Sequence, residues 1–222
     1  MTINLKNFLN TKPKLSKMGE FQELKPIDGL EISSFSADLY KNGRDDLALF
    51  YFKDGANYAA MYTSNSIVSQ TIEWNKKSNK SFTKALLVNT KNANTFTGDQ
   101  GIEGVDLVAK NLSRILTLRE SKSDQGVSET VKMKELIFAS TGVIGEKFPA
   151  ENIVSSLQPL VDKLRDDHNK LIWIKTASAI MTTDTKPKVA YEEIVVGNTI
   201  IKLAGVAKGS GMIAPNLATM LS

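Results

Sequence analysis

The chain of 222 residues contains no cysteine and one histidine, His168. Without cysteine it forms no disulfide, no thiolate zinc or iron–sulfur site and no thiol nucleophile. One histidine excludes a multi-histidine metal centre within the chain and leaves a serine–histidine–aspartate triad a single candidate base. We therefore expect no metal, and any catalysis has to use hydroxyls, amines, carboxylates or backbone amides. His168 itself is predicted to be a solvated residue at a helix end.

Long apolar runs and arginine are also scarce. No run approaches the roughly 20 apolar residues of a membrane helix, and the first twenty residues carry lysines but no apolar signal core. A cytoplasmic protein without a membrane partner is therefore expected. Only four of the 28 basic residues are arginine and the net charge is +4, which argues against a nucleic-acid partner. With 41% hydrophobic residues, the chain can bury an ordinary core.

Short apolar runs alternate with amphipathic stretches, which predicts an α/β protein with a single domain over residues 1–222. Strands are predicted at 46–53, 58–62, 84–89, 136–140, 189–196 and 199–206. Asp54-Gly55 and Gly197-Asn198 each predict a hairpin turn, because both pairs accept positive φ. Amphipathic helices are predicted at 104–119 and 150–168, whereas 171–181 suits a buried helix or a strand.

The last stretch, 208–222, is the most unusual: Lys-Gly-Ser-Gly-Met-Ile-Ala-Pro-Asn-Leu-Ala-Thr-Met-Leu-Ser. Two glycines and a proline force an irregular backbone, yet the segment is too apolar for a frayed tail. From these residues alone, a buried loop that packs against elements further along a longer chain is as good an explanation as a functional site. A phosphate-binding loop is disfavoured, because the Walker pattern places its lysine after the glycines and before Ser or Thr.

Residues 208–221 resemble the autoprocessing signature of the ornithine acetyltransferase family, also called glutamate N-acetyltransferase, of arginine biosynthesis. Three further segments resemble that family in the same order, namely 92–98 (Asn-Ala-Asn-Thr-Phe-Thr-Gly), 140–145 (Ser-Thr-Gly-Val-Ile-Gly) and 179–188 (Ala-Ile-Met-Thr-Thr-Asp-Thr-Lys-Pro-Lys). Residues 1–91 match more loosely, and Thr90-Lys91 stands where a Ser-Gly pair is expected. The resemblance implies a layered α/β sandwich of mixed, partly antiparallel sheets covered by helices, of the N-terminal-nucleophile, autoprocessed type.

In that family the precursor cuts itself between an alanine and a threonine, which correspond here to Ala218 and Thr219. Before the cut, the Thr219 hydroxyl can attack the Ala218 carbonyl, and the resulting ester can be hydrolysed. After the cut, the new α-amine has a reference pKa of about 7.7–8.0 and can serve as general base for its own hydroxyl. Thr219 is therefore the predicted nucleophile, and one residue replaces a serine–histidine pair.

An acyl-transfer site also needs donors for the oxyanion of the tetrahedral intermediate. The resemblance assigns this role to Thr141 and Gly142, which directly follow the predicted strand 136–140. Without the resemblance, the same residues suit an ordinary strand-ending turn. Asn92 and Asn94 are predicted to fix a loop near the site, since asparagine tolerates left-handed backbone and bonds its own turn.

The resemblance also implies that Lys208 and Thr182 contact the substrate, as does Thr219. Lys208 would neutralise a carboxylate of acetylornithine or glutamate, although a lone lysine is ordinarily solvated. Thr183 is the alternative to Thr182. Asp184 offers a structural explanation for the same run, because threonines and aspartate next to a helix often cap it.

The implied reaction moves the acetyl group of N2-acetylornithine to Thr219 and then to glutamate. No cofactor is implied, and acetyl-CoA as a second acetyl donor stays open. An N-terminal-nucleophile amidohydrolase or aminopeptidase, which passes the acyl group to water, is the alternative enzyme. A ligand-binding or scaffold domain is the non-enzymatic alternative.

Ser222 lies just beyond the predicted cut. We therefore expect an α-chain portion of residues 1–218. The resemblance implies a β chain that begins at Thr219 and continues beyond Ser222, with further substrate contacts and a heteromeric assembly such as a heterotetramer. Residues 1–222 alone are expected to be inactive.

Overall fold

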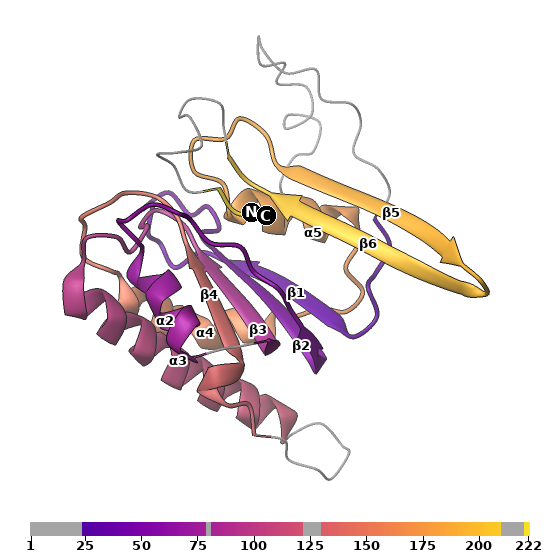
Figure 1. Cartoon of the computed structure of the whole chain (residues 1–222), viewed down its shortest axis with the longest axis horizontal. Helices are drawn as coiled ribbons and strands as arrows, with labels where there is room; N and C mark the ends of the chain where they lie inside the picture. The colour runs from indigo at the N-terminus through magenta and orange to yellow at the C-terminus, as the bar shows by residue number, and fades with distance from the viewer. Residues whose placement is uncertain (1–23, 79–80, 122–129, 210–219) are drawn as a thin grey trace.

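The computed structural model describes residues 24–78, 81–121, 130–209 and 220–222. Its centre is a four-stranded sheet in the order β1-β2-β3-β4 (Figure 1). The strands are β1 (Leu30–Phe35), β2 (Leu47–Asn57), β3 (Phe82–Asn89) and β4 (Leu136–Ser140). β1–β2 and β2–β3 pair antiparallel, whereas β3–β4 pair parallel. The carboxyl ends of β3 and β4 therefore meet at the same edge of the sheet.

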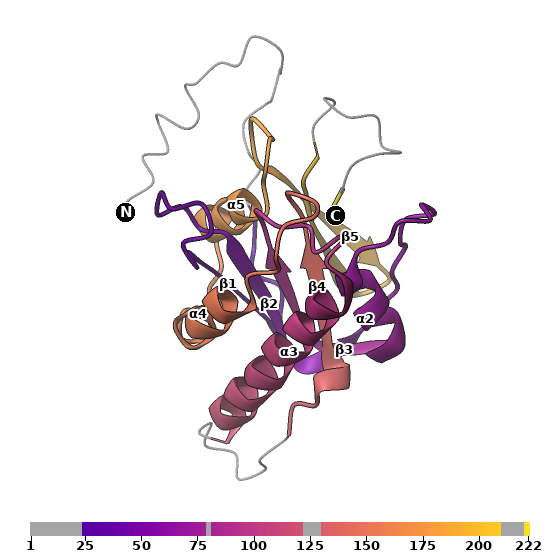
Figure 2. The same cartoon turned by 90° about the vertical axis from the view of Figure 1, so that its left-hand side faces the viewer.

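The two faces of this sheet carry different covers, because successive side chains point to opposite faces. Leu47, Leu49 and Tyr51 of β2 pack into the larger core, under α2 (Gln70–Ser78), α3 (Gly98–Glu120) and α4 (Ala150–Asp162) (Figure 2). Ala48 and Phe50 pack on the other face, with residues of α5 (Lys170–Ala179) and of the segments around it. A short 3-10 helix, η1 (Met133–Glu135), leads into β4. The predicted mixed α/β character is confirmed.

A separate two-stranded hairpin, β5 (Lys188–Val196) and β6 (Thr199–Ala207), lies over the face that carries α5 and extends away from it (Figure 1). The predicted turn at Gly197-Asn198 is confirmed, with Gly197 at φ +61°. Val189 and Val206 pack against the core under α5. The outer half of the hairpin exposes large apolar side chains on both faces, namely Ile194, Val195, Val196, Ile200, Ile201 and Leu203.

The hairpin predicted at Asp54-Gly55 is wrong, because β2 continues through these residues as one strand. Its register against β3 shifts between Tyr51 and Ala56, so the intervening residues form a bulge. Gly55, at φ +73°, serves this bulge, and a β-carbon there would collide with the ring of Phe82. A pair of residues that suits a tight turn thus also suits a bulge, and 58–62 form no strand.

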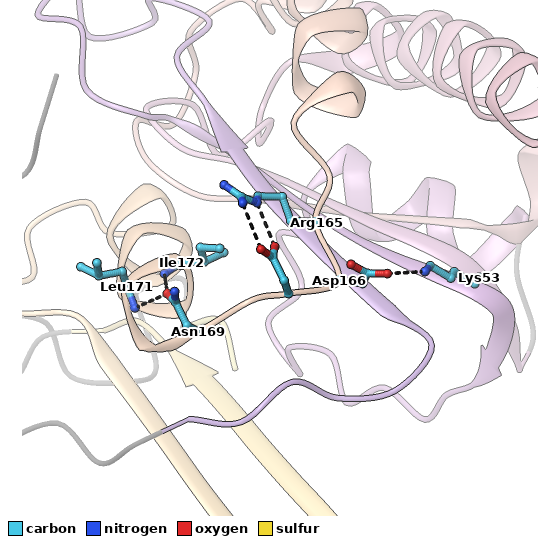
Figure 3. A network of polar contacts seen from close by, with 7 residues as sticks. Lys53, Arg165, Asp166, Asn169, Leu171 and Ile172 are labelled. Atoms are coloured by element: carbon cyan, nitrogen blue, oxygen red, sulfur yellow. Dashed lines mark hydrogen bonds and ion pairs between the residues drawn. The ribbon is translucent and has the colours of Figure 1, made fainter. Parts of the chain in front are cut away.

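The predicted helix 104–119 is confirmed within the longer α3, but the helix predicted at 150–168 ends at Asp162 as α4. The chain leaves the helix because the backbone of Arg165 pairs with Ile32 of β1. Arg165 then binds Asp167 through two hydrogen bonds of 2.9 and 3.0 Å, while Asp166 binds Lys53 at 2.8 Å (Figure 3).

His168 is fully buried, so its predicted exposure at a helix end is wrong. Its Nε2 accepts a hydrogen bond from the Ile27 N–H at 3.0 Å, and its ring stands edge-on to Trp173. Burial lowers the pKa of His168, which favours the neutral imidazole that this acceptor role requires.

The ambiguous segment 171–181 is mostly helix α5, capped by the Asn169 side chain (Figure 3). No helix among the described residues has both the length and the apolar character to cross a membrane.

Candidate functional site

The candidate site lies where β3 and β4 end at the same edge of the sheet. Beyond the strands, the loops 90–96 and 141–145 continue the parallel pairing through backbone hydrogen bonds. Val143 donates to the Lys91 carbonyl at 2.8 Å, and Ala93 donates to the Val143 carbonyl at 2.9 Å. These bonds extend the pairing of β3 and β4 into the loops. The backbone around Thr141 and Gly142 is therefore fixed by the sheet.

Thr141 and Gly142 have the geometry of a tightly constrained turn. Thr141 is 1% exposed, and its N–H donates to the Asn89 carbonyl at 3.1 Å. Gly142 has φ +139°, which L side chains rarely adopt. A β-carbon at position 142 would lie 2.2 Å from the carbonyl carbon of Lys91 and 2.6 Å from the backbone nitrogen of Asn92. Only glycine therefore permits this approach of the two loops.

Asn92 and Asn94 fix the neighbouring loop, which confirms their predicted structural role. The Asn92 side chain donates to the carbonyls of Glu146 and Lys147 and accepts from the Asn94 N–H at 2.7 Å. Asn94 has φ +50°, and its side-chain amide donates to the Thr71 hydroxyl and to a carbonyl of α3. The buried Asn94 amide therefore links the loop at the end of β3 to α2 and α3, which cover one face of the sheet.

Lys208 enters the site from the end of β6 and is 5% exposed. Its Nζ donates to the Thr141 Oγ1 at 3.0 Å and to the Thr182 Oγ1 at 2.9 Å. Three residues nominated in separate segments of the sequence therefore meet. An ammonium group can only donate, so each threonine oxygen accepts here, and each hydroxyl can still donate its own hydrogen to an acceptor.

Electrostatics of this cluster favour an anionic ligand. Burial lowers the pKa of Lys208, while the nearby charge of Asp184 acts in the opposite direction. A buried ammonium is costly unless negative charge compensates it. An ammonium and two hydroxyl donors together suit a carboxylate or an oxyanion. No group of three or more acidic or histidine side chains in the described ranges could hold a metal ion.

Asp184 organises the segment that carries Thr182. Its Oδ1 accepts from the Gly209 N–H at 2.7 Å and from the Lys188 Nζ at 2.6 Å. Burial alone would raise the pKa of Asp184, but the hydrogen bonds from Lys188 and Gly209 outweigh it and lower the pKa. The capping explanation for Asp184 is wrong, because a carboxylate only accepts hydrogen bonds, whereas the end of α5 offers carbonyls, and no helix begins after Asp184 within the described residues.

Sequence reasoning misjudged the role of Asp184 and missed Arg44, and both residues support this segment. Asp184 was considered only as a cap, although Lys188 four positions later is a local indication of an ion pair. Arg44 donates to the carbonyls of Ser178 and Met181 and so holds the chain just before Thr182. Nothing in the local sequence indicates this contact, which joins segments far apart in the chain.

Ala218 and Thr219 lie outside the described residues. The chain is described again from Met220, and Leu221 pairs with Lys208 in antiparallel fashion. The Lys208 N–H donates to the Leu221 carbonyl at 2.8 Å, and the Leu221 N–H donates to the Lys208 carbonyl at 3.4 Å. The first and last residues of the signature segment, Lys208 and Leu221, thus pair with each other next to the Thr141–Lys208–Thr182 cluster.

Residues 31–222 match the model of the ArgJ family. The arginine biosynthesis bifunctional protein ArgJ of Caulobacter vibrioides is 36% identical over 206 residues, which cover 91% of this chain and 47% of that protein. The chain thus spans about half the length of the curated relatives it matches.

Two solved structures share the fold. Arginine biosynthesis bifunctional protein argJ from Bacillus halodurans has a TM-score of 0.72 at 24% identity and covers 90% of this chain and 98% of its own. Ornithine acetyltransferase complexed with ornithine from Mycobacterium tuberculosis has a TM-score of 0.70 at 23% identity and covers 90% of this chain and 99% of its own. At these identities, the likeness concerns the fold alone.

Proposed function

Since this chain belongs to the ArgJ family, we propose that it supplies the α-chain portion, residues 1–218, of an acetyltransferase of arginine biosynthesis. The enzyme transfers the acetyl group of N2-acetylornithine to glutamate. The observation that carries this proposal is the buried Lys208, which binds Thr141 and Thr182 directly beside its pairing with Leu221. Leu221 stands two positions after Thr219 in the sequence, so the proposed nucleophile is joined to this cluster by a short piece of chain.

Thr219 has two roles in the proposal. In the precursor its Oγ attacks the Ala218 carbonyl, and the C–N bond breaks as the ester forms, which frees the Thr219 amine. Water then hydrolyses the ester to give the Ala218 carboxylate and the free Thr219 hydroxyl. In the mature enzyme that amine takes the hydroxyl proton as Oγ attacks the acetyl carbonyl of N2-acetylornithine. The ornithine amine leaves with a proton, and the α-amine of glutamate then attacks the acetyl ester.

Thr141 and Gly142 are proposed to hold the oxyanion of each tetrahedral intermediate. The bond from Lys208 to the Thr141 oxygen supports this role, because it directs the threonine hydrogen toward another acceptor. The amide of Gly142 would be the second donor, in a backbone that only glycine permits. Donors fixed before the reaction stabilise the developing charge without reorganisation.

Lys208 and Thr182 are proposed to bind the substrate carboxylate. Burial lowers the pKa of the Lys208 ammonium, and a bound carboxylate would offset the cost of that buried charge. The direct contact of Lys208 with the Thr182 hydroxyl supports Thr182 over Thr183 as the partner in this site.

Membership of the ArgJ family also underlies our proposals for the β chain, the assembly and the cofactors. A β chain that begins at Thr219 and continues beyond Ser222 completes the site, and the two chains form a heteromeric assembly in the cytoplasm. Residues 1–222 form one domain in a layered α/β sandwich of the N-terminal-nucleophile type. No cofactor is required, and acetyl-CoA would be an additional donor only in a bifunctional enzyme.

The test uses the protein produced from its complete reading frame, with N2-acetylornithine labelled in the acetyl group and with glutamate. We expect labelled N-acetylglutamate, a new chain that starts at Thr219, and a labelled acetyl ester on that chain in intact mass spectra. Thr219→Ala should abolish the cut, the ester and the transfer together. Labelled free acetate without N-acetylglutamate would indicate an amidohydrolase instead, and an uncut chain without either product would contradict the proposal.

A further inference from the structure

A chain of buried hydrogen bonds lies beside the loop that carries Thr141. Its members are each 7% exposed or less, namely Thr71 of α2, Asn89 at the end of β3, Asn94 of the neighbouring loop and Ser140 at the end of β4. The Ser140 hydroxyl lies 2.7 Å from the Asn89 Oδ1 and 2.8 Å from the Thr71 hydroxyl. The Thr71 hydroxyl in turn lies 3.1 Å from the Asn94 Nδ2. None of these four side chains takes part in the proposed reaction, yet Ser140 directly precedes Thr141.

Backbone carbonyls at both ends of this chain fix its direction. The Asn89 Nδ2 donates to the Asn92 carbonyl at 3.0 Å, so the Asn89 Oδ1 faces Ser140. The Asn94 Nδ2 donates to a carbonyl of α3 and to the Thr71 hydroxyl. An amide oxygen only accepts, so the Ser140 hydroxyl uses its single hydrogen on Asn89, and Thr71 is the donor to Ser140. The bonds therefore run in one direction, from Asn94 through Thr71 and Ser140 to Asn89.

Asn89, the last member of the chain, contacts both loops of the candidate site. Its backbone carbonyl accepts the Thr141 N–H at 3.1 Å, and its side chain donates to the Asn92 carbonyl. Gly142 lies directly against Asn92, because a β-carbon at position 142 would come within 2.6 Å of the Asn92 backbone nitrogen. A shift of the Asn89 side chain would therefore change how the two loops meet at Gly142.

Thr71 is the member of the chain that a helix supplies. It lies in the first turn of α2, which packs beside β4 (Figure 2). The Gln70 N–H donates to the Asn94 carbonyl at 2.9 Å, so the start of α2 is also fixed to the loop after β3. An apolar side chain at position 71 would leave an Asn94 N–H without its acceptor and Ser140 without its donor, in a place that water does not reach.

We propose that Thr71 is a positioning residue of the acetyl-transfer site. Through Ser140 and Asn89 it holds the two loops where the Thr141 hydroxyl and the Gly142 amide can donate to the oxyanion. Such donors act on charge that develops only in the transition state, so their displacement lowers kcat and leaves substrate binding unchanged. Only this step from loop position to rate rests on the proposed function.

Thr71→Val removes the hydroxyl and keeps the shape of the side chain. In the full-length enzyme, kcat per cleaved molecule should fall about tenfold, while KM for N2-acetylornithine stays within about twofold. Thr71→Ser keeps the hydroxyl and should restore kcat. The matched control is Asn75→Leu, because Asn75 lies one turn further along α2 and bonds the backbone of Phe138 in β4. Thr71→Val and Asn75→Leu should both lower the melting temperature, but Asn75→Leu should retain kcat. Equal kcat values in these two variants, or a higher KM with unchanged kcat in Thr71→Val, would overturn the proposal.

Residue-resolved amide hydrogen exchange on the same full-length proteins needs no activity, so it stays decisive if the proposed function fails. In Thr71→Val, the amides of Thr141 and Val143 should exchange about tenfold faster relative to the amide of Phe138. Asn75→Leu should instead speed the Phe138 amide, which loses its side-chain acceptor. Unchanged exchange at Thr141 and Val143 in Thr71→Val would overturn the positioning role. If Thr71→Val does not fold, Ser140→Ala removes the next hydroxyl of the chain and should give the same loss of kcat and the same faster exchange.

Discussion

The candidate site has two walls that are held in different ways. One is the sheet wall, loops 90–96 and 141–145, which continue the pairing of β3 and β4 and are fixed by buried amides. The other is the hairpin wall, 182–184 and 208–209, where the carboxylate of Asp184 gathers the contacts. Thr141 is therefore positioned by the core, whereas Lys208 depends on a few polar contacts. Changes in the sheet wall should mainly cost stability, and changes in the hairpin wall should mainly cost activity.

Gly142→Ala should have the largest effect. The new β-carbon would meet the Lys91 backbone at 2.2 Å in a strained backbone region, so we expect the free energy of unfolding to fall by about 2–5 kcal/mol. Urea titration of the full-length protein measures this. The matched control is Gly145→Ala, with φ +79° but no atom within 4 Å, for which about 1 kcal/mol is expected. Equal losses would show that the close approach of the loops does not matter.

Lys208→Met should lower kcat/KM for acetyl transfer by about 100-fold, roughly 2.7 kcal/mol, because it removes the cation that is proposed to bind the substrate carboxylate. The melting temperature should stay the same or rise, since a buried charge is removed from a site without ligand. Lys84→Met is the control, because Lys84 is equally buried but donates to the Lys53 carbonyl. We expect Lys84→Met to lower stability and leave kcat/KM intact. A loss of stability without a loss of activity in Lys208→Met, with the opposite result in Lys84→Met, would contradict the distinction between the two walls.

Asp184→Asn should have a smaller effect on activity, about tenfold or roughly 1.4 kcal/mol. Asparagine retains an acceptor for the Gly209 N–H but loses the negative charge near Lys208. The pKa of Lys208 should therefore fall further, and the alkaline limb of the kcat/KM profile should move to lower pH. Lys188→Gln is the control, since it removes the partly exposed Lys188 ammonium from the Asp184 Oδ1 but keeps the Asp184 charge and its bond to the Gly209 N–H. An equal loss in both variants would assign the effect to the Lys188 ion pair.

The smallest effect concerns His168, which packs beside Trp173 of α5 under the β5–β6 hairpin. Burial lowers the pKa of His168 below its ordinary 6.5. As pH falls below 6.5, His168 therefore becomes protonated in the unfolded chain while it is still neutral in the folded chain. His168 should therefore lower stability as pH falls below about 6.5 and contribute no pH dependence above it. His168→Gln keeps an acceptor for the Ile27 N–H and should flatten that part of the profile. Parallel profiles for both proteins between pH 5 and 7 would contradict this.

Short apolar runs next to turn residues made β3, β4 and the β5–β6 hairpin predictable. β1 was missed because its helix-covered face is polar: Glu31 is buried against Arg119, and the Ser33 hydroxyl donates to the Leu160 carbonyl. Helix α2 was missed because Asn75, a buried amide, bonds the backbone of Phe138 in β4. In each case a distant partner satisfies a polar group, and no local pattern reveals that partner.

The sequence was enough to nominate the candidate site residues, but it did not predict that their side chains contact one another. Lys208, Thr141 and Thr182 lie in separate segments, and only the pairing of β3 with β4 and the docking of the hairpin bring them within hydrogen-bonding distance. Asp184 was misread because a polar residue after an apolar helix resembles a cap. Its decisive partner, the Gly209 N–H, becomes its neighbour only through the fold.

The pairing of Lys208 with Leu221 also has a consequence for the order of events. It closes a loop around the proposed cutting point, and Leu221 packs with Val206 of β6 against the same core cluster. We therefore expect the pairing to form only once β6 is in place on the core. A self-cleavage that depends on this pairing can proceed only in molecules that have already folded. The appearance of the new amino terminus would therefore be a chemical record of correct folding, and misfolded copies would remain recognisable by their uncut length.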